Sequence, residues 1–284
     1  MKLDGRRTSS NVDDRRKIGG TAAGLGIGGI IVAALLAWAT GGNPLDAIMG
    51  QLADVSMQGG TEYVPTAEEN AMATFASQIL AGTEDVWTKE FEKMGRRYVP
   101  PKMVLFTRAT TSGCGSASAQ TGPFYCPGDQ TVYIDLSFFD QMKTQLKAGG
   151  DFAYAYVIAH EVGHHVQYLL GTLNQVQQQQ RRMSQRESNQ LNVRLELQAD
   201  FFAGIWAYHD NAMYHSLESG DIEKGLNAAS AIGDDRLQMQ SQGYTVPDAF
   251  NHGTSDQRVR WLKKGATTGI VANGDTFSPA YTSL

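Results

Sequence analysis

Cysteine is scarce in this chain of 284 residues: Cys114 and Cys126 are the only two, twelve positions apart in a stretch rich in Gly, Ser and Pro. This spacing does not match the Cys-x-x-Cys of a zinc knuckle, which excludes a cysteine metal site of that kind. We expect one local disulfide, whose loop closure would stabilise the fold by about 2–3 kcal/mol. Two free, buried thiols are the alternative.

Basic residues are fewer than acidic ones. The formal net charge is −5, with 24 Lys and Arg against 29 Asp and Glu. Residues 1–17 contain six Lys or Arg and three Asp, a net +3, so the rest of the chain carries −8. An acidic body of this kind argues against a nucleic-acid-binding surface, and no nucleic-acid partner is expected.

Charged side chains are absent altogether from Ile18 to Leu45. The apolar part of this run is long enough to span a bilayer, basic residues precede it, and Trp38 suits a membrane interface. The positive-inside rule then places the N-terminus in the cytoplasm and the main domain outside it. The expected division is a basic cytoplasmic leader (1–17), a transmembrane anchor (18–42), a linker (43–65) and a functional domain (66–284).

The expected localisation is therefore a cell membrane, single-pass, with the functional domain outside the cytoplasm. A cleaved signal peptide is the alternative, because Ala37-Trp38-Ala39 has the A-x-A form and cleavage would leave an N-terminus near Thr40. The long apolar run and long leader argue against it. Small residues at four-residue spacing could also form a homo-oligomer interface within the anchor: Gly20, Gly24 and Gly28.

One motif points directly at a chemical reaction. His160-Glu161-Val162-Gly163-His164 matches H-E-x-x-H, the pattern of zinc peptidases. On a helix, positions i and i+4 share a face, so both imidazoles can reach one metal ion. Glu161 is then close enough to take a proton from an attacking water. A buried helix with two ordinary histidines is the competing interpretation.

The motif lies in a segment that predicts one uninterrupted helix, with Asp151 as its N-cap and Gly171 as its C-terminal stop. Gly163 within that helix costs about 1 kcal/mol relative to Ala. It either allows another backbone to approach closely or is merely tolerated.

The remaining pattern favours an α+β fold weighted towards helix. Strands are expected before the motif and helices after it. We expect strands at 102–107 and 130–136, and helices from the Thr66 capping box to Leu80, from Thr83 to Met94, at 190–215, at 221–242, and from a Ser255 cap to Lys264. The strand at 131–136 could offer an open edge to an extended substrate.

Two histidines leave a metal site incomplete, since catalytic zinc usually has three protein ligands. Glu196 and Asp200 are spaced i,i+4 on a downstream helix and share a face. We assign Glu196 to the metal and Asp200 to the far ring nitrogen of a ligand histidine. An exposed acidic pair is the alternative, but the residues after Asp200 are apolar, where unpaired carboxylates are costly.

Peptide hydrolysis also needs a donor for the developing oxyanion. Four candidates are close in sequence and have no other assigned role: Tyr244, His252, Arg258 and Arg260. We select His252 as the catalytic residue of this group.

The sequence around the motif resembles the bacterial family of neutral zinc metallopeptidases. The predicted metal ligands are similar to the gluzincin arrangement HExxH…ExxAD. The resemblance covers nearly the whole chain and rests on five stretches: Ser112–Gly115, Gly122–Asp129, Val132–Asp135, Ala155–Gln167 and Gly253–Arg258. It implies a membrane-anchored, zincin-like metallopeptidase domain that holds one Zn2+, with a small antiparallel sheet before the motif helix. It also implies that the membrane is the bacterial inner (cell) membrane, with the domain periplasmic or extracellular. It supports the metal site more strongly than any substrate.

The expected function is a membrane-anchored zinc-dependent endopeptidase, in which Glu161 is general base to a zinc-activated water and the substrate is a protein or peptide. One alternative is a catalytically silent zinc-binding scaffold or interaction module at the membrane, although such a site would not need Glu161. The other is a membrane interaction protein whose histidines are incidental.

Overall fold

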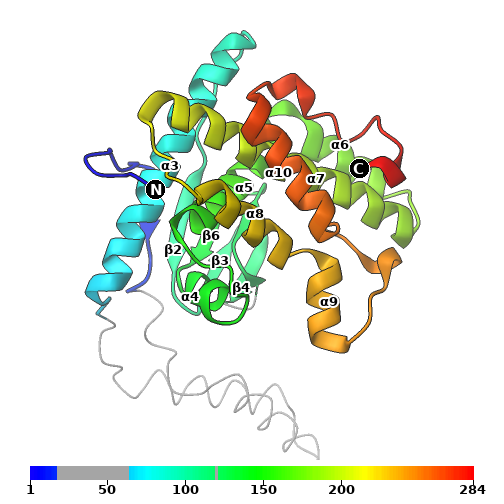
Figure 1. Cartoon of the computed structure of the whole chain (residues 1–284), viewed down its shortest axis with the longest axis horizontal. Coiled ribbons are helices and arrows are strands. Elements are labelled where there is room, and N and C mark those ends of the chain that lie inside the picture. Colours follow the sequence, from blue (N-terminus) through cyan, green and yellow to red (C-terminus); the bar gives the residue numbers. More distant parts are fainter. Residues whose placement is uncertain (18–63, 119–120) are drawn as a thin grey trace, which may run out of the picture.

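The computed structural model describes residues 1–17, 64–118 and 121–284. Helices surround a small sheet, and α5 runs through the middle of the molecule (Figure 1). The elements are β1 (Val12–Asp14), α3 (Ala67–Lys93), β2 (Lys102–Phe106), β3 (Ala109–Ser112), β4 (Gly115–Ser118), β5 (Phe124–Cys126), β6 (Thr131–Asp135), α4 (Ser137–Thr144), α5 (Asp151–Leu170), α6 (Thr172–Gln180), α7 (Gln185–Tyr214), α8 (Asp221–Ala231), α9 (Asp234–Gln242), η3 (Pro247–Ala249), α10 (Ser255–Thr268), η4 (Val271–Asn273) and η5 (Tyr281–Ser283).

The helix-rich α+β class is confirmed, but the main sheet is not antiparallel. Its four strands follow the order β1-β2-β6-β5, and β1, β2 and β6 run parallel while β5 is antiparallel to β6. Parallel neighbours need long crossovers, which helix α3 provides between β1 and β2. Within the described chain, the β3–β4 hairpin is a separate antiparallel pair. Strand β6 has a neighbour on both sides, so the expected open edge at 131–136 is wrong.

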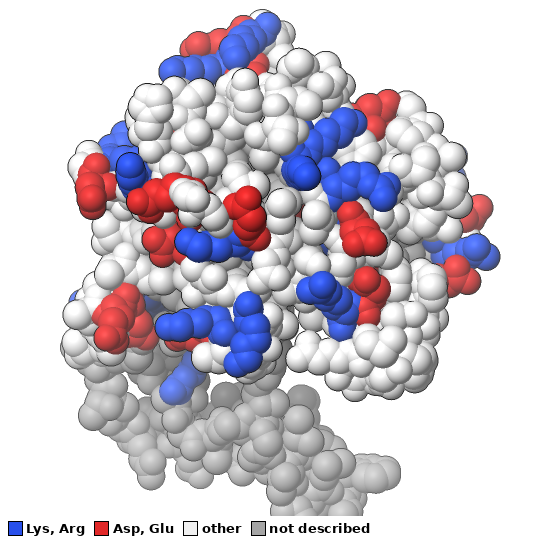
Figure 2. All heavy atoms as spheres, in the orientation of Figure 1, with Lys and Arg blue, Asp and Glu red and all other residues white. Residues whose placement is uncertain are grey.

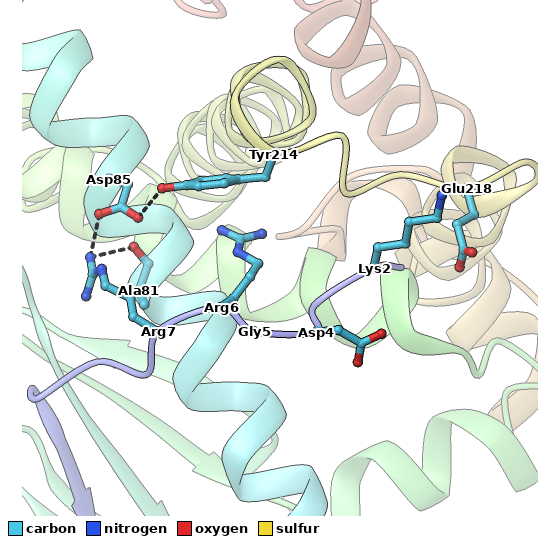
Figure 3. A pocket seen from close by; sticks show the side chains of 9 residues that line it. All are labelled: Lys2, Asp4, Gly5, Arg6, Arg7, Ala81, Asp85, Tyr214 and Glu218. Atoms are coloured by element: carbon cyan, nitrogen blue, oxygen red, sulfur yellow. Dashed lines mark hydrogen bonds and ion pairs between the residues drawn. The ribbon is translucent and has the colours of Figure 1, made fainter.

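Residues 1–17 form a strap that contacts α3 and α7, and Figure 3 shows its part around Lys2 to Arg7. Arg6 donates two hydrogen bonds to the Asp210 carboxylate, at 2.9 and 2.6 Å. Arg7 bonds Glu84 at 2.9 Å and Asp85 at 2.5 Å, and β1 then joins the sheet beside β2. Arg6 and Arg7 therefore neutralise acidic groups of the domain itself, whereas Arg15 and Arg16 pair with Asp13 and Asp14 within the strap. A hollow of about 700 Å³ lies beneath the strap. Strap residues line it together with Ala81, Asp85, Tyr214 and Glu218, and no residue of the HExxH motif does.

The predicted localisation is wrong. In the part of the chain that the structure describes, no helix is both long and apolar enough to cross a membrane. Residues 1–17 were placed across a membrane from the domain, yet β1 pairs with β2 of that domain and Arg6 bonds Asp210. A strand cannot pair with a sheet on the other side of a bilayer. The expected anchor at 18–42, its glycine face and the linker up to residue 63 lie outside the described residues.

On the face shown in Figure 2, basic and acidic side chains are interspersed, and no broad basic patch stands out. The absence of a nucleic-acid partner stays a prediction.

The Thr66 capping box is confirmed, with Thr66 and Glu69 bonding each other's backbone amides. Helix α3 then continues to Lys93 without the expected break at Thr83. The Thr83 hydroxyl donates to the Leu80 carbonyl at 2.7 Å, so it bonds back into the helix and caps nothing.

Helix α5 is buried along most of its length and packs against α3, α6, α7, α8 and β5. Gly171 ends it in the left-handed conformation with φ 87°, as the sequence predicts. Its N-cap is Gly150 rather than Asp151. The expected helix at 221–242 is two helices, because Gly233 packs against the backbone of Ser255 and leaves the helical path between α8 and α9. Thr254, not Ser255, caps α10.

The predicted disulfide is confirmed: Cys114 and Cys126 are bonded, and the described residues contain no free cysteine. Cys114 lies at the turn of the β3–β4 hairpin, and Cys126 ends β5. The disulfide therefore ties the hairpin to the edge strand of the main sheet.

Helices α7 and α10 cross in close contact at two glycines. A Cβ at Gly265 would collide with the carbonyl oxygen of Phe201, and a Cβ at Gly204 would collide with the carbonyl oxygen of Leu262. Both obstacles are backbone atoms, which cannot turn aside as a side chain could. This crossing therefore requires glycine on both helices.

We predict that Gly265→Ala lowers the free energy of unfolding by about 1–3 kcal/mol, because overpacking outweighs the roughly 1 kcal/mol that alanine gains in helix propensity. Denaturant unfolding measures the change. Lys263→Ala, at an exposed position on the same helix, is the control and should stay within about 0.5 kcal/mol. A Gly265→Ala protein as stable as wild type would show that the crossing can relax.

Candidate metal centre

Helices α5 and α7 bring the three predicted ligand residues together. His160 Nε2 lies 3.2 Å from Glu196 Oε2, and His164 Nε2 lies 3.6 Å from Glu196 Oε1. Each residue offers one ligand atom, and these three atoms all lie within 4.8 Å of one another. All three side chains are largely buried. Two imidazole nitrogens and a carboxylate oxygen thus face a common point.

Asp200 holds the other nitrogen of the first histidine. Its Oδ1 lies 2.8 Å from His160 Nδ1, and the same oxygen accepts from the Tyr156 hydroxyl at 2.6 Å. An ionised carboxylate can only accept, so His160 Nδ1 carries the hydrogen. In the neutral ring, Nε2 then presents its lone pair towards Glu196, as a metal ligand must.

Gln167 does the same for the second histidine. Its Oε1 lies 2.9 Å from His164 Nδ1, while its Nε2 donates to the Leu195 carbonyl at 2.7 Å. The Leu195 carbonyl oxygen can only accept, so the amide nitrogen faces it and the amide oxygen faces His164. Gln167 thereby orients one ligand and attaches α5 to α7 next to Glu196.

Arg258 of α10 balances the charge of Asp200. Its Nε donates to Oδ2 at 2.8 Å and its Nη2 to Oδ1 at 3.0 Å, with both side chains almost fully buried. Burial alone would raise the pKa of Asp200, but the charges of Arg258 and His160 lower it to about 2. Asp200 therefore stays ionised at neutral pH.

The ligand group itself attracts positive charge. Burial would lower the pKa of His160, but Asp200 and Glu196 together raise it to about 10. Burial would raise the pKa of Glu196, yet the two histidines hold it well below its usual range. Protons on the imidazoles supply positive charge that a metal cation would replace.

A cleft of about 520 Å³ opens over this group, and Glu161 and His252 both line it. Glu161 comes from α5, directly after His160. His252 is held by Asp234, which lies 3.2 Å from its Nδ1 and accepts its backbone N–H at 2.6 Å. These contacts and Glu196 raise the pKa of His252 against the effect of burial. The predicted ligands, Glu161 and His252 are thus gathered in one place.

The donor set fits zinc, which binds imidazole and carboxylate, and both histidines have an acceptor on the far nitrogen. Within residues 1–17, 64–118 and 121–284, no fourth His, Cys, Asp or Glu joins the group. Three protein ligands are typical of a catalytic zinc site, whereas structural sites have four.

The family described as "Putative neutral zinc metallopeptidase" matches residues 1–277. The chain belongs to this family. Among its relatives, Escherichia coli K12 "Uncharacterized protein YpfJ" is 51% identical over 287 residues, covering 98% of this chain and 99% of its own length. Mycobacterium tuberculosis H37Rv "Uncharacterized protein Rv2575" is 44% identical over 193 residues, 64% of each chain. No solved structure matches the chain.

Three residues that the sequence analysis does not single out support the site of this family member: Tyr156, Gln167 and Asp234. Helical spacing indicates two of them, since Tyr156 is four residues before His160 and Gln167 three after His164. Arg258, a candidate oxyanion donor from the sequence, instead binds Asp200, and no helical spacing links it or Asp234 to the motif.

We predict that Gln167→Leu weakens zinc binding about 10- to 100-fold, because His164 loses the acceptor that fixes its ring. Competition with a chelating dye measures the affinity. Gln178→Leu, at an exposed position on α6, is the matched control and should bind zinc as wild type does. Unchanged affinity in a folded Gln167→Leu protein would contradict this role.

Proposed function

We propose that this protein is a zinc-dependent endopeptidase. The observation that carries the proposal is the convergence of His160, His164 and Glu196 in a cleft that Glu161 also lines. A purely structural zinc site needs neither an open cleft nor a general base. Membership of the zinc metallopeptidase family supports the same reaction class.

His160, His164 and Glu196 would hold the zinc ion, with Asp200 and Gln167 fixing the two rings. When bound, zinc supplies a Lewis acid that polarises the scissile carbonyl and makes water a better nucleophile at neutral pH. The remaining work falls to side chains of this chain.

Glu161 moves the proton. Its carboxylate accepts a proton from the water whose oxygen attacks the carbonyl carbon. It then returns that proton to the amide nitrogen as the C–N bond breaks, releasing a carboxylic acid and an amine. The residue thus acts first as base and then as acid, and it ends the cycle unchanged.

In this proposal His252 stabilises the negative charge that develops on the carbonyl oxygen. Asp234 holds Nδ1, so the other ring nitrogen is the one available to a substrate in the cleft. Asp234 also favours the protonated ring, in which both nitrogens are donors. In this proposal Asp234 is the positioning residue and His252 the donor.

We predict that Glu161→Gln keeps about one zinc per chain but lowers peptide cleavage at least 10²- to 10⁴-fold, because glutamine cannot accept the proton. Casein or a quenched fluorescent peptide reports cleavage, and elemental analysis reports zinc. Glu223→Gln, at an exposed position on α8, should cleave as wild type does.

Removing the metal tests whether cleavage depends on zinc. A chelator should abolish cleavage by wild type, and added zinc should restore it. Equal cleavage by wild type and Glu161→Gln would rule out the role of Glu161. Zinc binding without cleavage in either protein would favour the silent zinc-binding module, and a protein without zinc would overturn both readings.

A further inference from the structure

The charged side chains that line the cleft already have partners or roles. They are Glu161, Glu196 and Arg258. Arg258 is 3% exposed and is bound to Asp200 through two hydrogen bonds. Glu161 and Glu196 belong to the proposed catalytic machinery. Among the described residues that line the cleft, no other Asp, Glu, Lys or Arg is left to pair with a substrate side chain.

Apolar side chains form much of the rest of the wall, and they come from several elements around the motif. Val157 lies one helical turn before Glu161 on α5, and Leu195 directly precedes Glu196 on α7. Phe138 of α4, Leu173 of α6 and Leu237 of α9 face the same space. Uncharged polar side chains, among them Gln177, Gln180 and Asn192, share the wall with these apolar ones.

We propose that the cleft selects substrates with bulky, uncharged apolar or aromatic side chains beside the scissile bond and disfavours charged ones there. This inference rests on the proposed peptidase function. Its cause is desolvation, since a charged side chain would lose water on entering the cleft, where every charged group, His252 included, already has a partner or a role in the proposed mechanism. An apolar side chain would instead gain burial against the wall.

Leu237 offers a way to change this preference without touching the metal centre. It is 37% exposed, so a charged side chain there can be tolerated. Met239, two residues further along α9 and 53% exposed, lines a different hollow with Gln145 and Leu146 and does not line the cleft. Identical substitutions at Met239 therefore control for charge added to the same helix.

The experiment measures kcat/KM for peptides that differ in one residue beside the cleavage site: Leu, Phe, Glu or Lys. Wild type should favour Leu and Phe over Glu and Lys by at least about tenfold. Leu237→Arg should raise the kcat/KM of the Glu peptide relative to the Leu peptide about two- to fivefold, the size expected of a partly exposed charge pair. Leu237→Glu should raise the kcat/KM of the Lys peptide relative to the Leu peptide by a similar factor. Met239→Arg and Met239→Glu should leave both ratios unchanged.

Equal rates for charged and apolar peptides, with cleavage dependent on zinc and Glu161, would overturn the inference and leave the peptidase function standing. If wild type cuts none of the peptides, the peptidase function fails, and peptide binding to the zinc-loaded Glu161→Gln protein decides the inference. Tighter binding of the Leu and Phe peptides would support it. Equal binding of all four, or binding of none, would overturn it.

Discussion

The close passage of helix α7 across Gly163 of α5 is the contact on which the metal centre depends. A Cβ at Gly163 would lie 3.0 Å from the carbonyl oxygen of Ala199, tighter than ordinary van der Waals contact. Gly163 directly precedes His164, and Ala199 directly precedes Asp200, so this point sets the separation of ligands on the two helices. A side chain here would require α7, which carries Glu196, to give way by a few tenths of an ångström. The glycine thus has a packing reason to set against its cost in helix propensity.

The charge of Arg258 stabilises the buried Asp200, which in turn orients His160. Asp200 is fully buried and would be costly alone, but Arg258 reaches it from α10 with two hydrogen bonds. The glycine crossing of α7 and α10 allows that reach, and Asp200 in turn fixes the His160 ring. The arrangement of the candidate metal centre therefore depends on three helices, although only two of them carry the candidate ligands.

Local patterns in the sequence were sufficient for the ligands and insufficient for their surroundings. His160 and His164 are four residues apart on one helix, and Glu196 and Asp200 repeat that spacing on another, so periodicity alone placed each pair on a face. The partnership of Asp200 with Arg258 joins residues 58 positions apart and has no local signature. The parallel pairing of β1 with β2 is equally non-local, because helix α3 lies between them. Without it, a basic N-terminus followed by an apolar run suggested a membrane topology that the strap excludes.

The central claim is that three side chains of this chain hold one zinc ion and leave room for a substrate. Anomalous diffraction at the zinc edge, from crystals of the zinc-loaded protein, tests it most directly. The account predicts a single strong peak bonded to His160 Nε2, His164 Nε2 and the Glu196 carboxylate, with no other protein donor. A peak elsewhere, or a fourth protein side chain closing the site, would contradict it.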